Sequence, residues 1–339
     1  MKFLPYTKLD GVPHVIVDGT PHKDSTLVLS HWINSGTDPR WMRDTSAEIV
    51  FDYLDHNSIA NHIKYVSNDH YDQDGLVAMI ALTYPHMAHK HRELLIDVAE
   101  AGDFGKYKDR RAAKIAMALV NILTPDSGYF EKSVFSLPYP EMAALFYKKG
   151  LELLPEMLED IDFFKALWDE EDEFLSYSED LVKEQRVSIE EDINNDIAIV
   201  TIPTELANKK FHKFAISHFG TIHDIAIHNA TKRARIFYIH GKKIQFKFRY
   251  ETWVQLKNNI HPLRVDLSPL AEKLSQIDNV KWKYDGSSKL VPLLYTDESR
   301  DTSLEAQKIL GLLVDELKSG EVDWNPYREC KENNNTCNF

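Results

Sequence analysis

The sequence has very few cysteines and no long apolar segment. Only Cys330 and Cys337 occur among its 339 residues, and both lie in the polar C-terminal tail, where they cannot cross-link a core. This usage indicates a reducing compartment. The longest apolar stretch, 76–82, is far shorter than the roughly 20 residues of a transmembrane helix, and the first residues hold no apolar core typical of a signal peptide. We therefore expect a cytoplasmic protein that does not enter a membrane.

Several common catalytic signatures are also missing. The sequence contains no Gly-x-x-x-x-Gly-Lys-Ser/Thr loop, no Gly-x-Gly-x-x-Gly motif and no Gly-x-Ser-x-Gly motif. The sequence therefore gives no support for nucleotide binding by a phosphate loop or by a dinucleotide-binding motif. It also gives no support for a serine nucleophile of the α/β-hydrolase type. The position of both cysteines argues against a thiol nucleophile and against zinc sites built from cysteine pairs.

Positive charge is in deficit, because 40 basic residues face 53 acidic ones and the net charge is -13. Such a charge repels nucleic-acid backbones at long range, so long duplex DNA is not an expected partner. Hydrophobic residues make up 43% of the chain and aromatic residues 11%, which is typical of a folded protein. The length suffices for two domains.

The pattern of apolar residues divides the chain into four parts. They are an α/β part over 1–155, an acidic helical connector over 156–195, a strand-rich part over 196–300, and a helix with a flexible tail over 301–339. Strands and helices alternate in the first part. This alternation predicts an α/β fold with an open, mostly parallel sheet and helices on both faces, followed by a smaller α+β C-terminal domain.

Particular elements can be placed within these parts. Asp44 or Thr45 is a suitable N-cap for a helix that opens at 44–48, and Gly102 is a suitable C-cap for a helix over 90–101. We expect further strands at 14–19, 26–31, 62–68, 197–202, 224–228, 235–240 and 243–250, and further helices at 76–82, 266–274 and 303–318.

The motif His70-x-Asp72-x-Asp74-Gly75 carries the clearest chemical signal, because it follows an expected strand and precedes an expected helix. Side chains at the carboxyl end of a parallel strand point into the crevice where ligands bind. Alternate residues of an extended segment share a face, so the imidazole and the two carboxylates should converge. This donor set suits Mn²⁺, Fe²⁺, Co²⁺ or Zn²⁺. The alternative is a solvated turn in which Asp72 or Asp74 caps the next helix.

Three more residues occupy similar positions. Asp18 and His31 each end an expected strand, and Asp103 follows an expected helix. Read alone, His31 fits a hydrogen-bonded interior histidine, and Asp103 fits a turn or capping residue as well as it fits a metal ligand. The group formed by His86, His89 and His91 has no carboxylate at metal-site spacing, which favours exposed residues at a helix start.

Together these motifs resemble the Asp-His-His (DHH) phosphoesterase superfamily over about 14–300. Residues 15–18 resemble its lone-Asp motif, 29–32 with the helix over 45–50 resemble its Asp-His-His motif, and 70–75 resemble its Asp-x-Asp motif. The order is permuted, only the middle histidine, His31, is kept, and the Gly-Gly-His loop is missing. The same sequence also resembles a set of uncharacterised bacterial proteins, which implies no function.

The resemblance implies a divalent-metal-dependent hydrolase of a small phosphoester or phosphoanhydride, working in a cleft between two domains. It implies two ions, with manganese favoured and zinc, iron, cobalt or magnesium as alternatives, which activate a water and clamp the phosphoryl oxygens. His70 and Asp72 would serve catalysis as well as metal binding, while Arg249, Arg264 or Lys283 of the strand-rich part would neutralise the phosphate. One ion would be held by Asp18, His31, Asp74 and Asp103, and the other by Asp18, His70 and Asp72.

The expected partner is a small anionic substrate such as a nucleotide, a short oligonucleotide or inorganic polyphosphate, with a homodimer left open. Two other interpretations remain. The missing last histidine and glycine-rich loop favour a metal-dependent hydrolase that acts on a non-phosphate substrate with the same scaffold. A binding or regulatory protein with a decayed site is the non-catalytic alternative.

Overall fold

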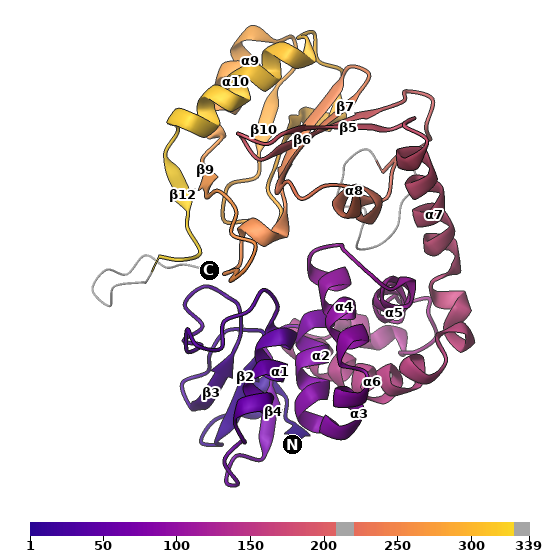
Figure 1. The fold of residues 1–339 in the computed structure, drawn as a ribbon, viewed down its shortest axis with the longest axis vertical. Coiled ribbons are helices and arrows are strands. Elements are labelled where there is room, and N and C mark those ends of the chain that lie inside the picture. The colour runs from indigo at the N-terminus through magenta and orange to yellow at the C-terminus, as the bar shows by residue number, and fades with distance from the viewer. Residues whose placement is uncertain (208–219, 329–339) are drawn as a thin grey trace. The chain divides into compact units, whose positions relative to one another are not determined.

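The structure, a computed structural model, describes residues 1–207 and 220–328, so Cys330 and Cys337 lie outside the described residues (Figure 1). The chain has the expected α/β fold and forms two compact units. Unit 1 comprises residues 1–173 together with 255–259, and unit 2 comprises 174–254 and the chain from 260 onward. Among the described residues, no helix combines the length and the apolar character needed to cross a membrane.

Unit 1 contains the predicted open parallel sheet, with its four strands in the order β1-β4-β2-β3. All four residues of β2 are buried, as expected for an interior strand of a parallel sheet. The strands are β1 (Lys2–Phe3), β2 (His14–Val17), β3 (Ser25–Leu29) and β4 (Tyr65–Ser67). The helices are α1 (Ser46–His56), α2 (Gln73–Thr83), α3 (Pro85–Lys90), α4 (Arg92–Asp103), α5 (Arg110–Asn121) and α6 (Tyr139–Glu159).

Helices α1 and α2 pack on each other and deliver polar residues to the carboxyl-terminal edge of this sheet. Of the two candidate N-caps, the structure selects Thr45, whose side chain accepts a hydrogen bond from Glu48 N at 3.2 Å. Glu48 accepts in return from Thr45 N at 3.0 Å, which completes a capping box. Residues 76–82 of α2 are all buried, since this helix lies between the sheet and helices α1, α4 and α6.

Unit 2 is built on a six-stranded sheet in the order β10-β11-β8-β7-β6-β5, in which only β6 and β7 are parallel. Its strands are β5 (Ser188–Asp192), β6 (Ile197–Ile202), β7 (Arg235–His240), β8 (Lys243–Phe248), β10 (Trp282–Tyr284) and β11 (Leu293–Thr296). A separate pair joins β9 (Arg264–Val265) to β12 (Val322–Trp324). Its helices are α8 (Asp224–Ala230), α9 (Ser268–Ile277) and α10 (Ala306–Ser319), while α7 (Asp169–Lys183) begins in unit 1.

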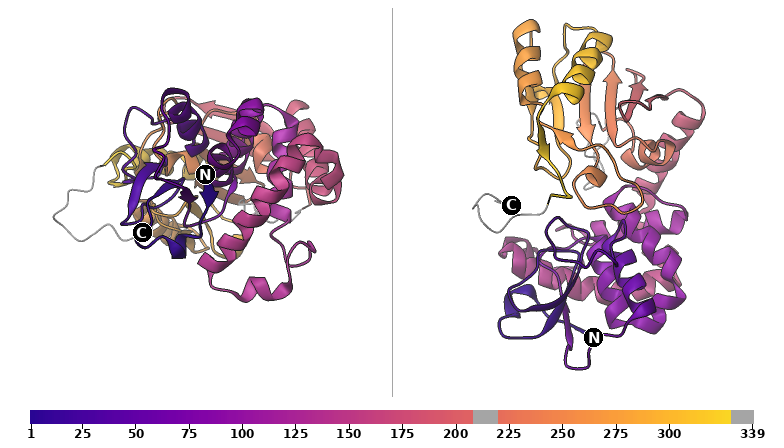
Figure 2. Two further views of the ribbon diagram at one scale, coloured as in Figure 1. Left: turned by 90° about the horizontal axis from the view of Figure 1, so that it is seen from below. Right: turned by 60° about the vertical axis from the view of Figure 1, so that its left-hand side comes forward.

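Helices cover both faces of the sheet in unit 2. Helices α9 and α10, orange and yellow in Figures 1 and 2, pack side by side over a core that includes Phe246, Leu274 and Leu313. A second core on the other face includes Ile227 of α8 and Tyr238 of β7. The sheet is therefore an interior layer rather than a solvated surface.

Three expected elements differ in the structure. Residues 188–192, within the expected helical connector over 156–195, form strand β5, which pairs with β6. Residues 224–228 form helix α8 rather than a strand; Ile225 and Ile227 alternate as in a strand, and the helix is too short to show its own period in the sequence. Helix α4 does not end at Gly102 but includes Asp103. Gly102 serves instead for close packing, since a Cβ there would lie 2.5 Å from the Cβ of Gln73 in α2.

Candidate metal centre

The predicted ligands gather at the carboxyl-terminal edge of the parallel sheet in unit 1. Their side chains come from the ends of three neighbouring strands and from two helices, so that residues far apart in sequence meet. The contributing residues are Asp18 after β2, His31 after β3, His70 and Asp72 after β4, Asp74 in the first turn of α2, and Asp103 at the end of α4.

Asp18 lies between the two imidazoles. Its Oδ1 is 3.3 Å from His31 Nε2, and its Oδ2 is 3.5 Å from His70 Nε2. Ser46 Oγ donates a hydrogen bond to Oδ1 at 2.8 Å. Asp18 has a φ of 48°, a left-handed conformation that residues other than glycine seldom adopt and that is concentrated at functional sites.

The first group of potential ligands surrounds His31, which is fully buried. Besides Asp18, its Nε2 faces Asp74 Oδ2 at 3.7 Å and Asp103 Oδ2 at 3.5 Å. On the other side of the ring, Nδ1 lies 2.8 Å from the carbonyl oxygen of Asp44. This contact assigns the proton to Nδ1 and directs the Nε2 lone pair toward the carboxylates, the arrangement found in histidine ligands of metals.

The second group surrounds His70, whose side chain is 20% exposed. Its Nε2 lies 2.9 Å from Asp72 Oδ2, and its Nδ1 lies 3.0 Å from Asp69 Oδ1. The indole of Trp32 stacks on the imidazole with a centroid separation of 4.6 Å. Asp69 and Trp32 therefore fix the orientation of this ring from two directions.

Asp72 and Asp74 are held by helix N-termini, but in different ways. Asp72 caps α2 with Oδ1, which accepts from Gly75 N at 2.9 Å, while its Oδ2 faces His70. Capping and membership of the cluster are thus compatible. Asp74 accepts from Ser46 N and Ala47 N, both at 2.7 Å, at the start of α1, where the helix dipole favours a carboxylate.

The expected single face shared by all three motif residues is not found. Asp74 belongs to α2 rather than to an extended segment. It therefore joins the group around His31, whereas Asp72 stays with His70. The motif consequently supplies ligands to both groups, with Asp18 common to the two.

The electrostatics of the centre reflect crowded negative charge. Burial raises the pKa of Asp18 well above its usual range, and the nearby carboxylates of Asp72 and Asp74 raise it further. The pKa of Asp103 is raised for the same reasons. Burial lowers the pKa of His70, but Asp72, Asp69 and Asp18 outweigh this effect, so its pKa is also raised well above the ordinary value.

The donor set fits divalent cations. One ligand atom from each of Asp18, His31 and Asp74 lies within 4.8 Å of the others, and the same holds for Asp18, His70 and Asp72. Asp18 Oδ2 and Asp103 Oδ2 are buried yet accept no hydrogen bond from the described residues. Buried carboxylate oxygens normally have partners, so these two are suited to a cation.

The surroundings of Arg249 and Arg264 do not support their expected contact with a phosphate. Arg249 is 1% exposed, and its Nη2 pairs with Glu251 at 2.6 Å. Arg264 is fully buried and donates to the carbonyl oxygens of Ser287, at 2.7 Å, and Leu290, at 2.8 Å. Both guanidinium groups serve the interior of unit 2, and we do not retain them as substrate contacts.

The sequence did not reveal the residues that hold the candidate ligands in place. Ser46 binds both Asp18 and Asp74, and its only signal was its place in the first turn of a capped helix. Asp69 is adjacent to His70 and could have been identified as its partner. The sequence indicates only a capping role for Asp44, and its contact with His31 could not be foreseen from sequence spacing.

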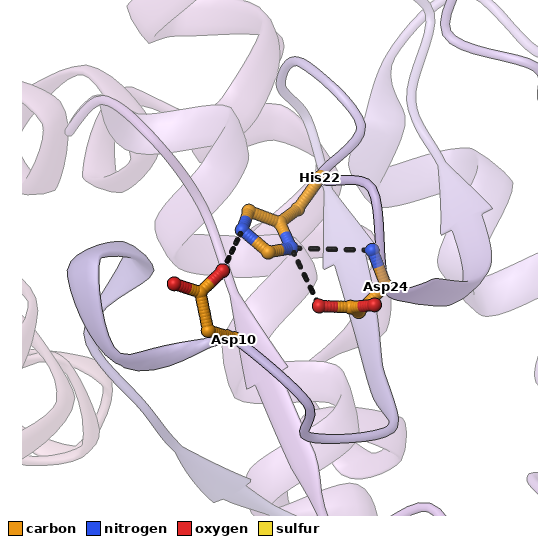
Figure 3. Close-up of side chains that lie close together, drawn as sticks. All are labelled: Asp10, His22 and Asp24. Carbon is orange, nitrogen blue, oxygen red and sulfur yellow. Dashed lines mark hydrogen bonds and ion pairs between the residues drawn. The ribbon is translucent and has the colours of Figure 1, made fainter.

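A third histidine-aspartate group lies elsewhere in unit 1, and Figure 3 shows His22 between Asp10 and Asp24. Asp10 is largely exposed and pairs with Lys23 Nζ at 2.8 Å. His22 Nδ1 accepts from Asp24 N at 3.3 Å. A lysine and internal hydrogen bonds thus already satisfy this group, which makes it a suitable control for the buried centre.

Comparison with known proteins places the chain in a family without assigning a function. No curated protein and no solved structure matches the sequence. A family model described as a family of unknown function matches residues 1–327, which include almost all of both units. The chain therefore belongs to the DUF6687 family.

Proposed function

We propose that this chain is a divalent-metal-dependent hydrolase of a small phosphoester or phosphoanhydride, related to the DHH phosphoesterases. The observation that carries the proposal is the position of Asp18, whose two carboxylate oxygens face two separate histidine-aspartate groups. A carboxylate shared between two cations is typical of two-metal hydrolytic sites. Asp18, His31, Asp74 and Asp103 would hold one ion, and Asp18, His70 and Asp72 would hold the other.

Divalent ions at this centre, with manganese favoured, would supply Lewis-acid activation of water and of a phosphoryl oxygen. The chain itself orients the ligands. Ser46 and the N-terminus of α1 hold the carboxylates of Asp18 and Asp74. The group around His31 is buried, whereas His70 is partly exposed, so a substrate would reach the centre from the side of His70.

The substrate we propose is a small anion, in keeping with the net charge of -13, which disfavours long duplex nucleic acid. We also propose a cytoplasmic location because of the low cysteine content. The burial of Arg249 and Arg264 favours a second candidate, a metal-dependent hydrolase of a non-phosphate substrate, since the arginines expected to bind phosphate lie inside unit 2.

The test is a substrate panel with metal-depleted protein to which Mn²⁺ is restored. Bis-p-nitrophenyl phosphate, pyrophosphate and nucleotides represent the first candidate, and p-nitrophenyl acetate and an anilide represent the second. The proposal predicts that the protein hydrolyses a phosphoester or phosphoanhydride only when Mn²⁺ is present. Asp18→Asn should abolish this hydrolysis, and Asp10→Asn should preserve it. Turnover of the ester or anilide alone would favour the second candidate. A wild-type protein that binds no divalent ion would indicate a decayed site.

A further inference from the structure

Residues 255–259 belong to unit 1, although the chain on either side of them belongs to unit 2. The chain leaves unit 2 after Val254 and returns at Ile260. The segment forms neither helix nor strand. Its place in unit 1 therefore depends on individual contacts, and these contacts converge on one part of the candidate metal centre.

The 255–259 segment makes hydrogen bonds to the two residues that determine the position of the His31 ring. Gln255 N donates to the carbonyl oxygen of His31 at 2.9 Å. Lys257 N and Asn258 N donate to Asp44 Oδ1 at 2.7 and 2.8 Å, and Asn259 Nδ2 donates to Asp44 Oδ2 at 2.7 Å. Both oxygens of a carboxylate that is only 7% exposed are thus engaged by this segment.

Asp44 transmits this anchorage to the imidazole. Its carbonyl oxygen accepts the hydrogen bond from His31 Nδ1, which orients Nε2 toward Asp18 and Asp103. Outer partners of histidine ligands fix the ring orientation and tune metal affinity. The two histidines differ in this respect, because His70 obtains its partner from the adjacent residue Asp69, whereas His31 depends on a segment more than 200 positions away.

We propose that residues 255–259 orient His31 in the metal centre through Asp44, which makes Asp44 and Asn259 positioning residues of that centre. The inference rests on the proposed metal-dependent function. It adds that one of the two ion sites depends on residues 255–259, which belong to unit 1 although the chain on either side of them belongs to unit 2. Loss of the anchorage should therefore weaken the ion held by the group around His31 and spare the ion held by the group around His70.

The test is metal affinity in Asp44→Ala, because this change removes the carboxylate and keeps the carbonyl oxygen that accepts from His31. Asp97→Ala is the matched control, since the buried Asp97 carboxylate likewise accepts from two backbone N–H groups, those of Lys108 and Asp109, at 2.9 and 2.7 Å. Titration calorimetry with Mn²⁺ gives the two affinities, and the visible absorption spectrum of bound Co²⁺ reports ligand geometry.

We expect Asp44→Ala to weaken one of the two Mn²⁺ sites by about 10- to 100-fold and to alter the Co²⁺ spectrum. Asp97→Ala should leave both sites unchanged. Asp69→Asn should weaken the other site, the one around His70. If the wild type binds two ions and Asp44→Ala binds them with the same affinities, the positioning role of Asp44 is overturned and the proposed function is not. A wild type that binds no ion would overturn the proposed function itself.

A second variant covers the case in which Asp44→Ala fails to fold. Asn259→Ala removes one of the three hydrogen bonds to Asp44 and leaves the backbone donors in place. It should weaken the same Mn²⁺ site in the same direction, by a smaller factor. Affinities in Asn259→Ala equal to those of the Asp97→Ala control would contradict the proposal.

Discussion

A single carboxylate, that of Asp18, faces two imidazoles with its two oxygens. Its left-handed backbone places this carboxylate at the junction of the two groups immediately after β2. Other candidate ligands belong to one group each. The consequence is an asymmetry among the ligands, in which Asp18 should matter for both ions and Asp72 or Asp74 for only one.

Asp18→Asn should abolish binding of both Mn²⁺ ions, whereas Asp72→Asn should abolish only one. Asparagine tolerates the left-handed conformation, so the substitution removes the charge without straining the backbone. Metal content after equilibration with Mn²⁺ and desalting measures the outcome. Asp10→Asn, in the exposed group of Figure 3, should retain both ions. Two ions retained by Asp18→Asn would refute the shared-ligand arrangement.

In unit 2, the Asp278 carboxylate accepts hydrogen bonds from Ser303 N at 2.9 Å and Trp282 Nε1 at 2.8 Å. Burial raises the pKa of Asp278, but the hydrogen bonds from Thr302, Ser303 and Trp282 outweigh burial and lower it to about 2. The ionised carboxylate therefore stabilises unit 2 above its ordinary pKa of 3.8, and this contribution is lost as the pH falls toward 2.

Asp278→Asn should lower the free energy of unfolding at pH 7 by about 1 kcal/mol, a figure that allows for solvent screening of a half-buried group. The difference from wild type should shrink as the pH falls from 4 toward 2. Urea unfolding at pH 7 and pH 3 gives the comparison. A difference that grows with acidification would contradict the assigned cause.

The candidate ligands could be predicted from the sequence, whereas the residues that hold them in place mostly could not. Asp18, His31 and His70 follow strands that are recognisable from sequence, and strand ends of a parallel sheet meet at one edge. The expected exposure of Arg249 is not found, although alternation along β8 indicates a solvated polar face. In the structure that face is buried, and Lys247 pairs there with Asp224 of α8.

Among the elements, α1 connects folding to the candidate site most directly. Its capping box fixes the first turn, and the N–H groups of that turn bind Asp74 while the Ser46 side chain binds Asp18. A helix start that normally binds water or a cap is thus used to hold two candidate ligands. Damage to the cap should therefore affect metal binding as well as stability.

Thr45→Ala should cost about 1 kcal/mol of stability and should also weaken Mn²⁺ binding, because the first turn of α1 frays without its cap. Asp109→Ala is the matched control, since Asp109 caps α5 by accepting from Arg111 N at 2.9 Å and does not belong to the centre. Urea unfolding and Mn²⁺ titration separate the two effects. Equal Mn²⁺ affinities in the two variants would contradict the role of α1.

The type of an element was predictable from the sequence where one side of the element is polar or where its run of apolar residues is long. Strands β2, β3 and β4 of the parallel sheet and helices α9 and α10 appear where they were expected. Helix α8 did not, because its seven residues are too few to show a helical period, and Ile225 and Ile227 alternate as in a strand. Gly102 lies inside α4 rather than after it, and its close approach to Gln73 is a tertiary contact that sequence spacing does not contain.

For the molecule as a whole, the buried centre makes stability depend on pH and on divalent cations together. Without a cation, the folded state raises the pKa of Asp18, Asp103 and His70. Each group then binds its proton more tightly in the folded than in the unfolded chain. The contribution of these three groups to stability should therefore be largest at low pH and should fall as the pH rises from about 4 through neutrality.

Mn²⁺ should accordingly stabilise the protein more at pH 8 than at pH 5.5, because the ion replaces protons that the folded state otherwise retains. An ion at 100 times its Kd contributes about 2.7 kcal/mol to the free energy of unfolding. The midpoint of thermal unfolding with and without Mn²⁺ at the two pH values measures this effect. A larger increase at pH 5.5, or an equal increase in Asp18→Asn, would contradict the account.

Anomalous diffraction from crystals grown with Mn²⁺ tests the central claim most directly, because it locates each ion independently of activity. The account predicts two anomalous peaks that share Asp18 as a ligand. One peak should lie against His31 and Asp74, and the other against His70 and Asp72. Crystals saturated with Mn²⁺ that show no peak within coordinating distance of Asp18 would contradict it.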